Sequence, residues 1–353
     1  MTKRIVALAG DGIGPEIMES ALAVLKAATQ STDFDYEVEN ELFGGSAIDA
    51  TGTPLPSETL TACKQADAIL LAAIGGPRWT QAEQTPEKGL LALRKALQLY
   101  ANIRPIKVAD SLIHLSPLKP ETVLGTDFVV VRELTSGIYF GEPRAKEVQQ
   151  AYDTNRYTVE EIERIMHQAF VIARGRKKQV TSVDKANVLA TSQLWREVAE
   201  QVAKEYPDIT LEHQYVDSAA MKLVTNPTAF DVIVTENLFG DILSDEGSVL
   251  PGTLGVLPSA SHSVAGASLY EPIHGSAPDI AGKNCANPVS MVLSVAMMMR
   301  QSFQEEGIAK RIEDACYNTM EKGILTPDLG GKSTTQQMTQ AIIDEVSNVA
   351  TIA

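Results

Sequence analysis

The sequence predicts an α/β protein, because strand-like apolar runs alternate along the chain with segments of helical period. The run at residues 68–74 is uninterrupted, which is typical of a strand covered on both faces of a parallel sheet. The chain has 353 residues, and one hydrophobic core rarely serves so many. We therefore expect two domains.

The chain opens with a predicted βα unit. Residues 4–9 read as a strand, residues 10–14 as a turn, and Pro15 and Glu16 as the first turn of a helix. The glycines of this turn are spaced G-x-G-x-G, whereas the dinucleotide fingerprint is G-x-G-x-x-G. The match is weak, and a tight turn required by the backbone explains the glycines equally well.

A second helix begins with Thr85 as N-cap and Pro86 at its first position. Four of its residues have i, i+3, i+4, i+7 spacing and share one face: Glu87, Leu90, Leu91 and Arg94. An acid and a base flank two leucines there, which a pure core stripe would not show. Pro105 holds Arg104 in an extended backbone and ends this helical region.

The middle of the chain continues the alternation. Strands are predicted at residues 127–134, 179–184 and 231–235. Residues 135–139 indicate a turn into another strand. Thr158 and Glu161 form a capping box for a helix that ends near Arg174. A further helix, at residues 192–204, is expected to bury Leu194, Trp195, Val198 and Val202.

The amino-acid composition excludes some classes of function. The 30 Lys and Arg residues face 45 Asp and Glu residues, and the net charge of −15 repels phosphate backbones and anionic membranes. We therefore expect neither nucleic-acid nor membrane binding. The three cysteines lack C-x₂-C spacing and read as free thiols of a reducing cytosol. The methionine-rich run at residues 291–299 is too short for a membrane span and is interpreted as core.

The segment at residues 237–255 carries the strongest chemical signal. Asp241 and Asp245 lie one helical turn apart and share a face. Two like charges at this spacing destabilise a bare helix by roughly 0.2–0.5 kcal/mol. The pair therefore suggests a positive partner, and Mg²⁺ is the natural candidate. A solvated acidic face is the alternative.

Other candidate groups are scattered along the chain. Arg94, Arg104 and Arg132 sit at element ends, and guanidinium groups of this kind bind small dicarboxylates. Tyr139 and Lys185 are candidate proton-transfer groups. Each of these has a plain alternative as a surface arginine, a cross-strand aromatic or a solvated lysine. The Gly- and Pro-rich loop at residues 271–283 suggests ligand binding, although it could be a surface connection with a structural His274.

Together these segments resemble a known family, the metal-dependent β-decarboxylating dehydrogenases that include isocitrate and 3-isopropylmalate dehydrogenases. The resemblance covers nearly the whole chain, and its motifs lie at residues 10–16, 93–105, 131–139, 237–255 and 275–282. Leu90 and Leu91 resemble the isopropylmalate branch, because isocitrate enzymes place small polar groups there. Burying an isopropyl group against them gains on the order of 1–3 kcal/mol, whereas a carboxylate would lose its water without gaining a partner.

The resemblance implies an activity and an architecture. The activity is metal-dependent oxidative decarboxylation of (2R,3S)-3-isopropylmalate to 4-methyl-2-oxopentanoate and CO₂ with reduction of NAD, a step of leucine biosynthesis. The architecture is a two-domain fold with a large twisted mixed sheet, not a Rossmann fold. Residues 1–99 and 252–353 would form a cofactor-side domain, and residues 100–251 would carry the metal ligands and the interface of a homodimer.

The resemblance also assigns roles. Lys185 would accept the proton of the substrate C2 hydroxyl and Tyr139 would protonate C3, with Lys185 and Asp217 supplied by the partner chain. Mg²⁺ or Mn²⁺ would be held by Asp217, Asp241 and Asp245. The substrate would contact Arg94, Arg104, Arg132, Asp217, Leu90, Leu91 and Val188. The cofactor would lie along residues 75–88 and along the loop at residues 275–287. Its contacts would be Ile13, Gly75, Gly76, Glu87, Glu271, His274, Gly275, Ser276, Ala277, Asp279, Ile280 and Asn287.

Within this assignment Asp279 favours NAD over NADP, because a 2′-phosphate would meet its negative charge. The loop at residues 10–14 would then not cradle phosphate. Two alternatives stay open: a sister enzyme acting on malate, tartrate, homoisocitrate or isocitrate, and a non-catalytic regulatory subunit. Without the resemblance, a Mg²⁺-dependent phosphohydrolase would be a further candidate.

Overall fold

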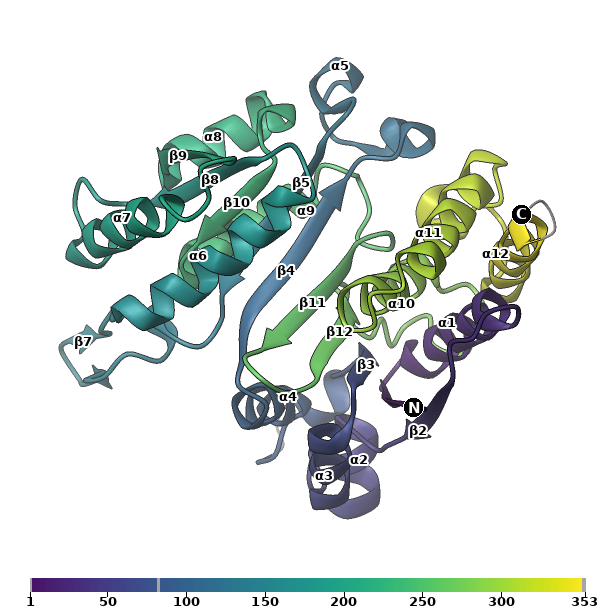
Figure 1. Cartoon of the computed structure of the whole chain (residues 1–353). Helices are drawn as coiled ribbons and strands as arrows, with labels where there is room; N and C mark the ends of the chain where they lie inside the picture. The colour runs from purple at the N-terminus through teal and green to yellow at the C-terminus, as the bar shows by residue number, and fades with distance from the viewer. Residues whose placement is uncertain (1, 81–82, 351–353) are drawn as a thin grey trace. The chain divides into compact units, whose positions relative to one another are not determined.

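A computed structural model describes residues 2–80 and 83–350 of the chain. It has the predicted α/β class, with helices packed against the strands of a mixed sheet (Figure 1). Contacts divide the chain into two compact units, Met1–Leu99 with Thr253–Ala353, and Tyr100–Gly252. Gly252 was expected in the first domain but clusters with the second unit, where it approaches the Leu115 carbonyl too closely for any side chain.

The first unit contains five neighbouring strands in the order β2-β1-β3-β12-β11. They are β1 (Lys3–Gly10), β2 (Tyr36–Asn40), β3 (Ala68–Ala73), β11 (Pro258–Ser263) and β12 (Ser268–Pro272). Strands β2, β1, β3 and β12 pair in parallel, and β11 runs antiparallel to β12. All six residues of β3 are buried, as predicted for a strand covered on both faces.

The helices of this unit are α1 (Gly14–Thr29), α2 (Gly45–Thr51), α3 (Ser57–Gln65), α4 (Pro86–Ala96), α10 (Val289–Gln301), α11 (Glu306–Glu321) and α12 (Thr335–Ala350). Helices α1, α10, α11 and α12 pack together as one group (Figure 1). Every residue of α10 from Val289 to Met299 is buried, so its methionines fill the core as predicted. Short 3₁₀ turns lie at Pro77–Trp79 and Pro327–Leu329.

The second unit contains strands in the order β4-β5-β10-β8-β9. They are β4 (Leu99–Lys107), β5 (Asp127–Glu133), β8 (Gln179–Asp184), β9 (Thr210–Tyr215) and β10 (Val232–Thr235). Strand β4 is antiparallel to β5, and the remaining neighbours pair in parallel.

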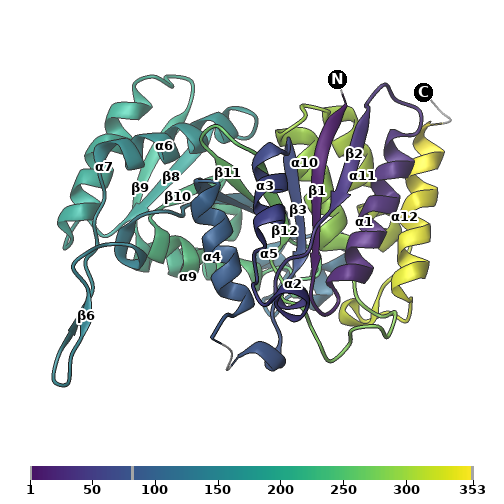
Figure 2. The same ribbon diagram turned by 90° about the horizontal axis from the view of Figure 1, so that it is seen from below.

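The helices of this unit are α5 (Pro120–Val123), α6 (Val159–Arg174), α7 (Ala190–Ala203), α8 (Val216–Thr225) and α9 (Asn237–Ser248). Helix α6 packs against α7, and α8 packs against α9. Short 3₁₀ segments lie at Asp110–Leu115, Gly137–Tyr139 and Pro227–Ala229. A separate hairpin of β6 (Ala145–Lys146) and β7 (Ala151–Tyr152) stands out from the unit (Figure 2).

The predicted helix starts are confirmed. The Thr85 side chain accepts a hydrogen bond from the Lys88 N–H with Pro86 next in the chain, and Thr158 and Glu161 form both bonds of the capping box. Helix α7 buries Trp195, Val198 and Val202 as predicted, whereas Leu194 is only half-buried. Cys63, Cys285 and Cys316 are free. In the described part of the chain, no helix has the length and apolarity needed to cross a membrane.

Two local predictions are wrong. Residues 135–139 do not turn into a strand but end in the 3₁₀ turn Gly137–Tyr139. The cause is Glu133, whose buried carboxylate accepts the N–H groups of Thr135 and Ser136 and bends the chain. Helix α4 ends at Ala96, well before Pro105. Pro105 lies inside β4, opposite Val129 of β5.

Candidate active site

Helix α9 presents the two predicted acids on its open face. It begins two residues after β10, so the end of a buried strand fixes its start. Leu243, Ser244 and Gly247 are buried against the unit, while the Asp241 and Asp245 side chains are 37% and 73% exposed. The predicted shared face is therefore accessible to a ligand.

Asp241 contacts both an arginine and a tyrosine. Its Oδ1 accepts from Arg132 Nη1 at 2.5 Å, and its Oδ2 accepts from the Tyr139 hydroxyl at 2.6 Å. Burial, then the hydrogen bond to Asp241, raises the pKa of the Tyr139 phenol. The phenol therefore keeps its proton at neutral pH and can act as an acid.

Asp245 pairs with the second predicted arginine of this unit. Arg104 Nη1 lies 2.8 Å from Asp245 Oδ1 and 3.0 Å from the Ser244 hydroxyl, while its Nε donates to Asn102 Oδ1. Each of the two aspartates on α9 thus faces a guanidinium group. The positive groups that lie against these two exposed aspartates are arginine side chains.

Asn237 holds Arg132 in place, and the sequence reasoning missed it. Its side-chain oxygen accepts from both Nε and Nη2 of Arg132, at 3.0 and 2.8 Å. Its side-chain nitrogen donates to the Ser136 carbonyl, and its backbone N–H donates to the Tyr157 hydroxyl. A Cβ on Gly240 would lie 2.6 Å from Arg132 Cγ, so only glycine lets the arginine lie across the helix.

Lys185 and Asp217 form an ion pair with each other. Lys185 follows the end of β8, and Asp217 lies in the first turn of α8. The hydrogen bond from Lys185 lowers the pKa of Asp217, which stays ionised. Nearby in sequence, Val188 is 67% exposed. Both side chains of this ion pair are accessible to a ligand.

A metal ion needs more ligands than α9 alone supplies. Among the residues that the structure describes, no group of three His, Cys, Asp or Glu side chains is gathered closely enough to hold one. Two carboxylates one turn apart offer the oxygen ligands that Mg²⁺ or Mn²⁺ prefers, but they leave positions open. The residues therefore fit a metal whose shell is completed from outside this helix.

In the first unit, helix α4 buries Pro86, Gly89 and Leu93. The predicted mixed face is therefore distinct from its core face. Leu90 packs partly on the core and Leu91 is 55% exposed. Arg94 Nη2 lies 2.9 Å from Glu271 Oε1, so these two predicted site residues meet across 177 positions of sequence.

Three predicted cofactor residues meet at one point of this unit. The Ser276 hydroxyl donates to the Gly75 carbonyl at 2.7 Å, and the Ile13 N–H donates to the Ser276 carbonyl at 2.8 Å. The Glu87 carboxylate lies beside Gly75, where an added Cβ would be 3.0 Å from Oε1. Gly76 follows Gly75 in an extended backbone. Within the predicted lining at residues 75–88, residues 81 and 82 lie outside the described residues.

In the loop after β12, some polar groups already have hydrogen-bond partners in the described part of the chain and others do not. His274 Nδ1 lies 2.9 Å from the Gly275 carbonyl, and its buried Nε2 has no partner among the described residues. Burial lowers the pKa of His274, which favours the neutral ring. Asp279 is exposed and Ala277 takes a positive φ in the turn before Ile280. Asn287 is occupied, because it caps α10 at Val289 and donates to Asp328.

The turn at residues 10–14 is a structural turn. Gly10 and Gly12 have φ of +69° and +59°, and an added Cβ would lie 1.9 Å from the Ala73 carbonyl oxygen or 2.0 Å from that of Ser276. The tight-turn explanation of these glycines is confirmed. Asp11, which the sequence reasoning also missed, is buried in this turn and accepts three backbone N–H groups.

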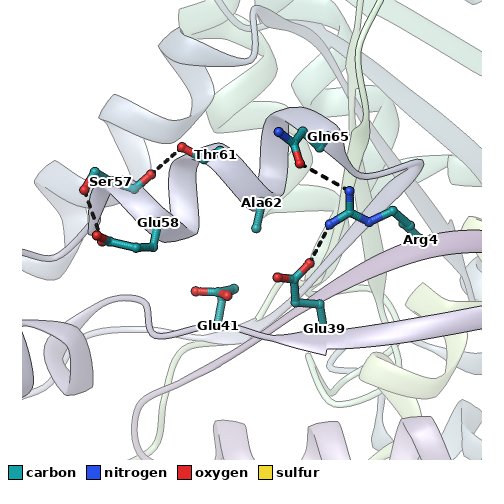
Figure 3. Close-up of a pocket in the computed structure, with 8 residues that line it drawn as sticks. All are labelled: Arg4, Glu39, Glu41, Ser57, Glu58, Thr61, Ala62 and Gln65. Atoms are coloured by element: carbon teal, nitrogen blue, oxygen red, sulfur yellow. Dashed lines mark hydrogen bonds and ion pairs between the residues drawn. The ribbon is translucent and has the colours of Figure 1, made fainter.

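A polar hollow of about 350 Å³ lies elsewhere on the first unit (Figure 3). It is lined by Arg4, Glu39, Glu41, Ser57, Glu58, Thr61, Ala62 and Gln65. Arg4 bonds to Glu39 at 2.9 Å and to Gln65 at 3.2 Å across it. None of the predicted site residues lines this hollow, so it is separate from the candidate active site.

The chain is similar to known proteins over nearly its whole length. The family described as isocitrate/isopropylmalate dehydrogenase matches residues 4–346. The 3-isopropylmalate dehydrogenase of Streptococcus mutans is 66% identical over 97% of this chain and 99% of its own length. That of Listeria monocytogenes is 61% identical over 98% and 99%.

Solved structures show the same fold. Isocitrate dehydrogenase from Methylococcus capsulatus is 37% identical with a TM-score of 0.85 and covers 98% of this chain and 100% of its own. A β-decarboxylating dehydrogenase from Thermococcus kodakarensis is 36% identical with a TM-score of 0.86 and covers 99% and 98%. The chain therefore belongs to the isocitrate/isopropylmalate dehydrogenase family.

Proposed function

We propose that the chain catalyses NAD-dependent, metal-dependent oxidative decarboxylation of (2R,3S)-3-isopropylmalate to 4-methyl-2-oxopentanoate and CO₂, in leucine biosynthesis. The observation that carries the proposal is the contact of Asp241 with both Arg132 and Tyr139. A metal-type carboxylate, a carboxylate-binding cation and a proton donor meet there. Relatives at 61% and 66% identity that carry the isopropylmalate name support the substrate.

The apolar face of α4 supports isopropylmalate over isocitrate. Leu91 is 55% exposed and Leu90 is partly so, with Arg94 on the next turn. An isopropyl group covers the leucines while its neighbouring carboxylate binds the arginine. A third carboxylate, as in isocitrate, would lie against the leucines without a hydrogen-bond donor.

The arginines bind the substrate by changing partners. Arg104 and Arg132 pair with Asp245 and Asp241, and Arg94 pairs with Glu271. Asp241 and Asp245, with Asp217 of the partner subunit, would hold Mg²⁺ or Mn²⁺, and the guanidinium groups would then be free to bind the substrate carboxylates. When bound, the cation stabilises the negative charge that develops on the substrate oxygen as CO₂ leaves.

Two residues of the chain handle protons. As a neutral amine, Lys185 would take the proton of the C2 hydroxyl while hydride passes from C2 to NAD. The neighbouring Asp217 holds the Lys185 side chain in place. After CO₂ leaves, Tyr139 protonates C3. Its raised pKa means that it yields the proton to a strongly basic carbon and not to solvent.

The proposed cofactor is NAD. Ile13, Gly75 and Ser276 form one hydrogen-bonded group, and the partnerless Nε2 of His274 offers a further contact. The exposed Asp279 can accept from a ribose hydroxyl and repels a 2′-phosphate, which favours NAD over NADP. Glu87, Glu271, Gly275 and Asn287 belong to the same proposed site.

Exposed apolar side chains of the second unit support the proposal of a homodimer. Four exposed apolar side chains lie on the packed helices α8 and α9 or directly after α9: Met221, Val224, Ile242 and Val249. Such a patch is typical of a subunit interface. The two-stranded hairpin β6–β7 is too small to be stable alone, which supports a second contact. Free cysteines support a cytoplasmic location, and the acidic charge speaks against nucleic-acid binding.

Variants of the proton-transfer pair test the mechanism. Lys185→Met and Tyr139→Phe should each lower kcat by about 10²–10⁴-fold, because each removes a positioned acid or base. The dissociation constant of isopropylmalate should change little. Lys204→Met, on the exposed end of α7, is the control and should keep wild-type turnover. The proton-transfer assignment fails if either active-site variant keeps near-normal kcat.

The metal and cofactor are tested in the same assay. Protein treated with chelator should form no NADH, and added Mg²⁺ or Mn²⁺ should restore the reaction. NADP should be reduced far more slowly than NAD because of Asp279. Full activity in chelator would contradict the metal proposal, and equal use of NADP would contradict the role of Asp279.

A further inference from the structure

We propose that Asp11 is a positioning residue for the cofactor, although it does not itself touch the cofactor. Its carboxylate fixes the Gly75 peptide against the Ser276 loop and so sets the shape of the surface that receives NAD. The inference rests on the proposed cofactor site, and it gives a role to a residue of the motif at residues 10–16 to which the family resemblance assigned none.

The contacts of Asp11 reach two distant segments of the chain. Oδ2 accepts the N–H groups of Gly45 and Gly75, both at 2.8 Å, and Oδ1 accepts the Ser46 N–H at 2.7 Å. The side chain is only 4% exposed. A buried carboxylate is stable only when such donors replace its water, and bonds to an ionised acceptor are about twice as strong as neutral ones.

Gly75 is held on both sides of its backbone. Its N–H bonds to Asp11, and its carbonyl accepts from the Ser276 hydroxyl at 2.7 Å. The Ser276 carbonyl in turn accepts the Ile13 N–H at 2.8 Å. The hydrogen bonds therefore close a ring that runs from Asp11 to Gly75, Ser276 and Ile13. Three members of this ring are proposed cofactor contacts.

The backbone around this ring leaves no room for adjustment. Gly75 has φ of +95°, which L side chains rarely adopt. A Cβ on Gly44 would lie 2.8 Å from Asp11 Oδ2, and one on Gly12 would lie 2.0 Å from the Ser276 carbonyl oxygen. The Gly75 peptide can thus be placed accurately, provided that the Asp11 side chain stays in position.

A cap for helix α2 would explain only part of the arrangement. The bonds to Gly45 and Ser46 would satisfy that role, because these N–H groups start α2. The bond to Gly75 adds nothing to α2 and joins a segment 64 residues away to the turn. The experiment must therefore separate a loss of cofactor binding from a loss of folding.

The test variant is Asp11→Asn, which keeps the shape but replaces one acceptor oxygen with a donor group. The backbone N–H groups on one side of residue 11 then face the amide nitrogen, which donates hydrogen bonds and cannot accept them. We expect the Kd of NADH, measured by fluorescence titration of the intact protein, to rise about tenfold or more. The Kd of isopropylmalate with Mg²⁺ should stay within about twofold, because its proposed contacts lie elsewhere.

Asp67→Asn is the matched control. The Asp67 carboxylate also accepts a backbone N–H, that of Arg4 at 2.8 Å, and lies in the same unit at the opposite end of β3. Its removal should leave the Kd of NADH unchanged. Ser276→Ala is a second test variant, because it frees the Gly75 carbonyl without disturbing a charge. It should also weaken NADH binding and keep a wild-type thermal midpoint.

Each outcome has a separate meaning. Wild-type NADH affinity in both Asp11→Asn and Ser276→Ala would overturn the positioning role. Equal weakening of NADH and isopropylmalate with a lowered thermal midpoint in both variants would also overturn it, because a general folding defect would then be the cause. If the wild-type protein bound isopropylmalate and Mg²⁺ but no NADH, the proposed function itself would fail.

Discussion

At the scale of single residues, Glu236 is a buried carboxyl group with an unusual environment. It lies between β10 and α9 and is 4% exposed, with its side chain bonded to Asn155. Burial raises its pKa from 4.5 to about 7, the hydrogen bond from Asn155 opposes this rise, and the charge of Asp184 adds to it. The folded protein therefore keeps a proton on Glu236 that the unfolded chain loses.

This shift makes stability depend on pH. Between pH 4.5 and about 7 the folded state binds more protons than the unfolded state, so the free energy of unfolding falls as pH rises. Glu236→Gln imitates the protonated form and should remove this fall. At pH 8 it should be more stable than wild type by up to about 3 kcal/mol, and near pH 4 it should be equal to it.

Urea unfolding of both proteins from pH 4 to pH 8 measures the effect. Glu197→Gln, on the exposed face of α7, is the control and should follow wild type throughout. Parallel curves for wild type and Glu236→Gln across the whole range would show that Glu236 is already ionised in the folded protein.

The residues that the sequence revealed are those with a local pattern. Asp241 and Asp245 follow from helical spacing, and Leu90 and Leu91 from a face that departs from a core stripe. Asn237 and Asp11 have no such pattern, because their importance lies in partners 105 and 64 positions away. Only the tertiary fold brings Arg132 to Asn237 and Gly75 to Asp11.

At the scale of elements, local signals predicted the starts of α4 and α6 and the buried strand β3. Pro86 and the capping box act within one turn, so the sequence contains the whole cause. The two failures had distant or unexpected causes. Glu133 bends the segment at residues 135–139 by binding its backbone, and pairing with β5 carries β4 straight through Pro105.

The exposed face of α4 gives a specificity prediction. Leu91→Ala should lower kcat/KM for isopropylmalate about tenfold, because part of the apolar contact with the isopropyl group is lost. Stability should hardly change, because Leu91 is 55% exposed. Leu124→Ala, 56% exposed at the end of α5, is the control. An unchanged kcat/KM in Leu91→Ala would show that α4 does not contact the substrate side chain.

At the scale of the whole molecule, the proposal requires two chains for each active site. Lys185 contacts Asp217 within its own chain, and in the described residues no third acid joins Asp241 and Asp245. We propose that the Lys185–Asp217 pair of one chain completes the site that contains Asp241 and Asp245 of the other chain. Two inactive variants should then restore activity when they are combined in one dimer. A mixed dimer of Lys185→Met and Asp241→Asn chains has one site with both residues intact.

Co-expression of the two variants tests whether a mixed dimer regains activity. With random pairing, half of the dimers are mixed and each has one working site, so about a quarter of wild-type activity should return. Each variant alone should be inactive. If the mixture stayed inactive while forming dimers, Lys185 and Asp241 of the same chain would have to serve one site.

The most direct test of the central claim is the rate of NADH formation with Mg²⁺ and NAD from isopropylmalate, compared with isocitrate, malate and tartrate. We expect a far higher kcat/KM for isopropylmalate, with one CO₂ released for each NADH. A preference for isocitrate would contradict the role given to Leu90 and Leu91, and no reaction with any of the four would contradict the proposed catalysis.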